Sequence, residues 1–242
     1  MMPSVKIFIF LIIFHLSCTA KPLIHYIGSA YESRSDIFLY SEEYKEFESN
    51  RVLHAKSTYL NINNKIIAEK NIKYLNSLAA PNFTFSNHLT GVNASVKVTD
   101  SVNISYRSSF ASKTKSVTLP KLKNLVVDSG FHYFIQDHWD SLLNKNSVVI
   151  NYVSPSRLGI MPLVIKFHSK IKTNTQTIIV YKIESTSFIL RFFVSPIYLH
   201  YDINSRRLLR FEGISNIKLK SGAKHVRLNF NYDILERGLN VD

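Results

Sequence analysis

The stretch DSGFHYFIQDHWDSLLN, residues Asp128–Asn144, decides the fold, because it carries the one long helical pattern in the sequence. Apolar side chains recur there at spacings of three and four residues, which places one apolar stripe along a helix. The stripe consists of Phe131, Phe134, Ile135, His138 and Leu142, with Trp139 beside it. Asp128 is expected to cap the first turn, and Gly130 is tolerated close to the start. A single helix with one apolar face must cover a sheet formed by the flanking segments.

Short strands separated by polar turns are predicted before this helix. The turns are too short for crossover connections, so neighbouring strands should pair as antiparallel hairpins. The expected strands are Ile24–Tyr31, Ile37–Phe47, Val52–Ile62 and Ile66–Tyr74. Residues 75–120 are richer in Ser, Thr and Asn, but Val96–Tyr106 alternates across a turn near Asp100. That alternation predicts a further hairpin with one face in water.

More strands are predicted after the helix, and the last is the clearest, because apolar and polar residues alternate along it. The expected strands are Val148–Ser154, Gly159–His168, Thr175–Glu184, Phe188–Val194, Ile197–Tyr201, Arg207–Asn216 and Lys224–Tyr232. The fold class is therefore mainly β: a strongly curved antiparallel sheet or incomplete barrel of about eleven strands, with the helix on its concave face. Residues 21–234 form one domain and residues 235–242 a loose tail. With only seven glycines, a gently curled sheet is favoured.

Residues 1–20, MMPSVKIFIFLIIFHLSCTA, predict a secretory signal peptide. Lys6 precedes an apolar run, and Cys18 and Ala20 stand at the small-residue positions of a cleavage site. The run is shorter than the roughly 20 residues of a membrane anchor. A lipid anchor on Cys18 is the alternative, but His15 stands where a lipobox needs an apolar residue. Cleavage would deliver the protein to the periplasm and remove its only cysteine. No later run is apolar enough to span a membrane as a helix.

The formal charge of +13 is spread along the chain, with denser patches at 113–123, 166–172, 206–210 and 218–227. It favours attraction to an anionic membrane or cell-envelope polymer, and the alternative is an ordinary solvated surface. No nucleic-acid-binding motif is present. Arg206, Arg207 and Arg210 form a candidate anion site. Alternatively, they pair with acids such as Glu212 or are hydrated.

Catalytic motifs are weak in this sequence. The densest group of ionisable residues consists of Asp128, His132, Asp137, His138 and Asp140. A general base held by a carboxylate is conceivable there. A capping aspartate, solvated charges and a core histidine explain the same residues, and this interpretation is favoured. There is no Gly-x-Ser-x-Gly elbow and no His-x-x-x-His spacing, so neither a nucleophile, a metal site nor a cofactor is predicted.

Two blocks carry a resemblance to known proteins. They are Val127–Phe131 leading to His138–Asp140, and Pro196–Asp202 leading to Arg207–Gly213. Together with the signal peptide they resemble uncharacterised exported proteins of Gram-negative bacteria, a resemblance that implies no activity. The order of strands, helix and strands is also loosely similar to periplasmic lipoprotein carriers of the LolA and LolB type. That likeness implies an unclosed barrel lidded by helices over an apolar cavity, and it concerns architecture alone.

These observations favour a non-enzymatic periplasmic protein that binds a lipid-like or amphiphilic ligand in an apolar groove under the helix. The alternative is an envelope structural or interaction protein that docks on a partner or a cell-wall polymer, and it predicts a filled interior. The predicted ligand contacts are the residues of the helical stripe, Phe131, Phe134, Ile135, His138, Trp139 and Leu142. An enzyme would need Asp128 and His138 to line one open cavity.

Overall fold

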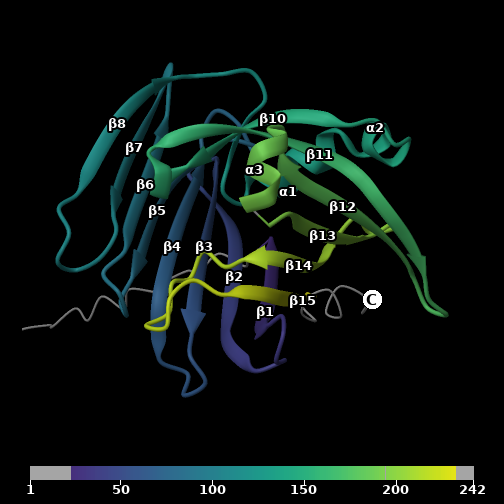
Figure 1. Cartoon of the computed structure of the whole chain (residues 1–242), viewed down its shortest axis with the longest axis horizontal. Helices are drawn as coiled ribbons and strands as arrows, with labels where there is room; N and C mark the ends of the chain where they lie inside the picture. Colours follow the sequence, from purple (N-terminus) through teal and green to yellow (C-terminus); the bar gives the residue numbers. More distant parts are fainter. Residues whose placement is uncertain (1–22, 194, 233–242) are drawn as a thin grey trace, which may run out of the picture.

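The computed structural model describes residues 23–193 and 195–232. The predicted signal peptide at 1–20 and the predicted tail at 235–242 lie outside these described residues. The described chain forms one sheet of fifteen strands in two arms that meet at its centre (Figure 1). The expected mainly β, curled architecture with one principal helical segment is confirmed, with fifteen strands in place of about eleven.

The first arm is a meander in which each strand pairs with the next one along the chain. Short turns join its strands, so every pair is antiparallel. Its strands are β1 Ile24–Glu32, β2 Phe38–Ser49, β3 Val52–Leu60, β4 Ile66–Tyr74, β5 Asn82–Asn87, β6 Asn93–Val98, β7 Ser101–Arg107 and β8 Lys115–Pro120. The hairpin predicted within Val96–Tyr106 is confirmed as β6 and β7.

The second arm is antiparallel except for β9, which pairs parallel with β10 across the helical segment. Its strands are β9 Leu125–Val127, β10 Val148–Ser154, β11 Gly159–Lys172, β12 Thr177–Ser185, β13 Ile197–Asp202, β14 Leu208–Ile214 and β15 His225–Tyr232, with a short 3-10 helix at Pro155–Arg157. The arms join where β1 pairs with β15, from Tyr26 opposite Tyr232 to Glu32 opposite Val226. In the described residues, β8 and β9 end the sheet.

The predicted helix is two helices, α1 Gly130–Asp137 and α2 Trp139–Leu143, which break at His138. Nδ1 of His138 lies 2.9 Å from the Phe134 carbonyl oxygen, which the His138 amide also contacts at 3.2 Å. A side chain that shares a helical acceptor weakens the helix at that turn. The capping prediction for Asp128 is wrong: Ser129 is the N-cap residue, and no side chain caps it.

The apolar stripe of the two helices packs on the second arm. Phe134, Ile135, Trp139 and Leu142 are buried there with residues of β9 to β13 in one core cluster. A second cluster fills the first arm and includes Ala30 of β1 and Leu228 of β15, where the arms join. The helices are therefore part of the core of the second arm.

The strand predicted at Phe188–Val194 is wrong, because Phe188–Phe193 forms helix α3. A short apolar run does not distinguish a buried strand from a helix. The side chain of Arg191 ties α3 to the end of β12: its Nε donates to the Ser185 carbonyl at 2.7 Å, and its Nη1 lies 3.4 Å from Glu184. Among the described residues, no helix is long and apolar enough to cross a membrane.

Candidate functional site

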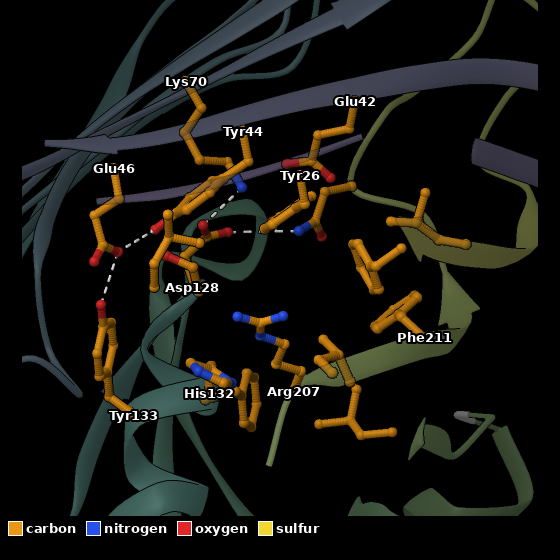
Figure 2. Close-up of a pocket in the computed structure, with 18 of the residues that line it drawn as sticks. Tyr26, Glu42, Tyr44, Glu46, Lys70, Asp128, His132, Tyr133, Arg207 and Phe211 are labelled. Atoms are coloured by element: carbon orange, nitrogen blue, oxygen red, sulfur yellow. Dashed lines mark hydrogen bonds and ion pairs between the residues drawn. The ribbon is translucent and has the colours of Figure 1, made fainter. Parts of the chain in front are cut away.

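A cavity of about 510 Å³ lies inside the curl of the sheet (Figure 2). Strands β1 to β4 supply one wall, β13 to β15 supply another, and the N-terminal turns of α1 lie between them. The volume falls within the range of roughly 300–1,000 Å³ that small-molecule sites occupy. The alternative of an envelope structural or interaction protein predicted a filled interior. A cavity of this size does not fit that prediction.

Tyrosine rings cover much of the cavity wall. Tyr26 and Tyr44 stack with their ring centroids 4.7 Å apart and an interplanar angle of 7°. Burial raises the pKa of every tyrosine in the wall, so each hydroxyl stays protonated and can donate a hydrogen bond. These residues are Tyr26, Tyr40, Tyr44, Tyr59, Tyr74, Tyr133, Tyr152, Tyr201 and Tyr232.

Strand β2 brings two glutamates to the same wall. Residues at alternate positions of a strand share a face, so Tyr40, Glu42, Tyr44 and Glu46 all point inward and are all buried. Glu42 accepts a hydrogen bond of 3.0 Å from the Tyr59 hydroxyl. Oε2 of Glu46 accepts two, from the hydroxyls of Tyr44 and Tyr133, both at 2.7 Å. The wall is therefore acidic as well as aromatic.

A buried ion pair in the cavity wall joins β4 to the turn before α1. Nζ of Lys70 lies 2.6 Å from Oδ2 of Asp128, and both side chains are almost fully buried. Burial opposes the charged form of Lys70, but the charges of Asp128 and Glu42 outweigh it and hold the pKa of Lys70 above its ordinary value. Burial raises the pKa of Glu42, against the opposing charge of Lys70.

Two polar atoms in the cavity wall have no hydrogen-bond partner among the described residues: Nδ1 of His132 and the hydroxyl of Tyr201. The two rings stack, with centroids 5.9 Å apart and an interplanar angle of 13°. Burial lowers the pKa of His132 to about 4, so its imidazole is neutral at neutral pH. Buried polar atoms without partners are uncommon in folded proteins, and here a ligand could supply the partners.

The structure divides the predicted ligand contacts into two groups. Phe131 lines the cavity and stacks on Tyr152, with ring centroids 5.0 Å apart. Phe134, Ile135, Trp139 and Leu142 lie in the core behind it, and His138 stacks on Phe134 outside the cavity lining. The side of α1 that faces the cavity consists of Phe131, His132, Tyr133 and Gln136.

The three predicted anion-binding arginines do not form one cluster. Arg206 and Arg207 line the cavity, and the guanidinium of Arg207 lies over the Tyr232 ring, 5.3 Å from its centroid. Arg206 lies over the Trp139 ring at 5.3 Å. Arg210 is elsewhere, where its Nε donates to Asn229 at 2.9 Å and its Nη1 lies 3.5 Å from Glu212. The predicted alternative, pairing with Glu212, therefore describes Arg210.

The ionisable group considered for catalysis is also dispersed. Asp128 and His132 line the cavity, whereas Asp137 and Asp140 are exposed to solvent and His138 is outside the lining. Asp128 and His138 therefore do not share one open cavity. No group of three or more His, Cys, Asp or Glu side chains in the described part of the chain could hold a metal ion.

Sequence reasoning missed the acidic and aromatic wall of β2 and its neighbours. The signal was the Tyr-x-Glu-x-Tyr-x-Glu alternation at 40–46, which places tyrosines and glutamates on one face of a strand. In a strand with one wet face, glutamates are expected to point to solvent. The contacts of this face of β2 with side chains of β3, β4 and α1 show that it lies inside the protein.

Comparison with known proteins supports the architecture. No protein-family model and no curated protein sequence matches the chain. The crystal structure of a β-barrel-like protein of the domain of unknown function DUF1849, from Brucella abortus, is similar to it, with a TM-score of 0.53. The fold is β-barrel-like. The alignment covers 89% of this chain and 100% of that chain at 6% sequence identity, so the likeness concerns the fold alone. It agrees with the expected resemblance to an uncharacterised bacterial family, and the likeness to LolA and LolB carriers stays a prediction.

Proposed function

We propose that this protein binds a small amphiphilic molecule in the cavity between its two arms. The observation that carries the proposal is the cavity itself, about 510 Å³ in volume, with aromatic walls and a few convergent polar groups. Ligand sites have this composition: apolar surface supplies affinity, and a small number of polar groups fixes orientation. Glu42 and Glu46 would bind a polar end, and Phe131, Phe211 and Phe230 would cover an apolar part.

The basic surface supports a role near an anionic membrane, with the periplasm as the proposed location. Four exposed lysines, Lys113, Lys115, Lys121 and Lys123, lie on and beside the edge strand β8. Each such charge near an anionic surface contributes about 1 kcal/mol of attraction. The surface would bring the cavity close to a source of amphiphilic molecules.

Native mass spectrometry of the gently purified protein tests the proposal. We expect a copurified small molecule, or binding of added amphiphiles at one molecule per chain. A Leu208→Trp variant should lower this binding at least tenfold, because Leu208 lines the cavity and the larger ring would fill part of it. Ile62→Trp is the matched control, since Ile62 is exposed in a turn. An empty protein with no affinity for any amphiphile would overturn the proposal.

A further inference from the structure

The cavity holds more buried acid than base. Three carboxylates line it, on Glu42, Glu46 and Asp128, and Lys70 is already paired with Asp128. Within residues 23–193 and 195–232, no cationic side chain comes within 4.0 Å of the carboxylate of Glu42 or of Glu46. Two further cations line the cavity: Arg206 is exposed and lies over the Trp139 ring, and Arg207 lies over the Tyr232 ring. Glu42 and Glu46 are therefore the two carboxylates of the lining that an added cation could pair with.

The position of Glu46 leaves room for a cationic partner. Both tyrosine hydroxyls that bind Glu46 donate to the same oxygen, Oε2, so Oε1 keeps its capacity to accept. The carboxylate is nearly fully buried and lines the cavity. Burying a carboxylate removes its hydration, and an opposite charge in contact with it offsets that loss.

The rings beside the two glutamates also suit a cation. The face of an aromatic ring is electronegative and attracts an ammonium group that lies within about 6 Å of the ring centroid. The wall contains one example of this arrangement: the Lys70 ammonium is paired with a carboxylate and lies 6.0 Å from the centroid of Tyr59. Tyr26 and Tyr44 extend the same surface between Glu42 and Glu46.

We propose that the polar end of the ligand is a cationic amine or quaternary ammonium group, held by Glu46 and Glu42 among the tyrosine rings of β1 to β4. This inference rests on the proposed function and names its ligand class. His132 adds no competing charge at neutral pH, because its imidazole is neutral. Its free Nδ1 and the free hydroxyl of Tyr201 can bind an uncharged polar group of the same ligand.

Three amphiphiles with the same twelve-carbon chain test the inference: dodecyltrimethylammonium, dodecyl maltoside and dodecyl sulfate, titrated calorimetrically below their micelle concentrations. We expect the ammonium probe to bind at least about tenfold more tightly than the neutral maltoside. The protein carries a charge of +13, so non-specific attraction favours the sulfate. A preference for the cation would therefore oppose the overall field of the molecule and come from the cavity.

Variants locate the site of that preference. Glu46→Gln and Glu42→Gln should each weaken the ammonium probe about tenfold and leave the maltoside unchanged. Glu43→Gln is the matched control: it neighbours Glu42 in β2 but points to the other face, where it pairs with Lys45 at 2.7 Å. Circular dichroism confirms folding of each variant. If one of the two glutamine variants does not fold, the other variant and the comparison of the three probes on the wild type still test the inference.

The outcomes separate the two proposals. Equal affinity for ammonium and maltoside, unchanged in the glutamine variants, would overturn the cationic head group and leave the amphiphile site standing. A preference for dodecyl sulfate would also overturn the cationic head group. If Leu208→Trp then lost the binding of dodecyl sulfate, the cavity would still be the binding site. Failure of all three probes to bind would count against the amphiphile site itself.

Discussion

Gly130 begins α1 at a position where any side chain would meet the backbone of another segment. A Cβ added there would overlap the carbonyl oxygen of Ala79 and lie 2.5 Å from its carbonyl carbon. That carbonyl also accepts the Val127 amide at 3.0 Å, so the contact holds the start of the helix against the segment before β5. The sequence predicts only that a glycine is tolerated here, because the partner is distant in the chain.

Gly130→Ala should therefore lower the free energy of unfolding by about 1–3 kcal/mol, the range for overpacking a tight site. Gly159→Ala is the control, because the nearest atom to its added Cβ is the Arg157 carbonyl oxygen at 3.6 Å. We expect the control to change stability by less than about 0.5 kcal/mol. Urea denaturation measures both, and equal small losses would contradict the close approach at Gly130.

The Lys70–Asp128 pair gives a second prediction at this scale. Lys70→Met leaves the Asp128 carboxylate buried without its cation, which should cost about 3–5 kcal/mol of stability. Lys56→Met, in an exposed pair whose Nζ lies 3.0 Å from Glu69, should cost less than about 1 kcal/mol. Adding Asp128→Asn to Lys70→Met should recover part of the loss, because the uncompensated charge is removed. Similar losses for the two lysine variants would refute the pairing.

His132 makes stability depend on pH. The unfolded chain binds the proton near pH 6.5, whereas the folded protein binds it only near pH 4. Between these values the unfolded state holds more protons, so the free energy of unfolding falls as the pH falls. When the pH is lowered from 7 to 5, the free energy of unfolding of the wild type should fall by about 1–2 kcal/mol more than that of His132→Gln. His225→Gln, at an exposed histidine, should behave as the wild type does.

Helices α1 and α2 act as a core element at the scale of secondary structure. Leu142 is fully buried against the second arm, so Leu142→Ala should cost about 2–5 kcal/mol through lost burial and a residual cavity. Phe131→Ala should cost less than Phe134→Ala, because Phe131 faces the cavity and Phe134 faces the core. Denaturant melts compare the three. Losses below about half a kilocalorie at Leu142 and Phe134 would mean that the helices are a movable lid.

Elements were predictable from the sequence where their pattern is local. The strands up to Tyr74 and strand β10 follow from apolar runs between polar turns, and the helical stripe follows from its spacing. Strand β9 has only three residues and pairs with β10 across the helices, so no local pattern reveals it. The break at His138 depends on a contact between a ring nitrogen and a carbonyl. The cavity wall depends on which face of β2 is covered, a property of the whole sheet.

At the scale of the molecule, β1 and β15 lie in the middle of the sheet although they come from opposite ends of the described chain. Amides in this pair should exchange with solvent at the rate of global unfolding, whereas those of the edge strand β8 should exchange faster by local fraying. Hydrogen exchange measured by NMR tests this order. Slower exchange in β8 than in β1 and β15 would indicate that the arms separate while each stays folded.

The pairing of β1 with β15 also determines when the cavity can exist. During synthesis, β1 emerges first of the described strands and β15 last, while the hairpins between them need only near neighbours. Contacts between distant segments slow folding far more than they weaken the folded state, because the entropy of closing a loop grows only slowly with its length. The arms can therefore form early, and the walls contributed by β1 and β15 meet at the end. A nascent chain has no ligand site to fill until its final strand is in place.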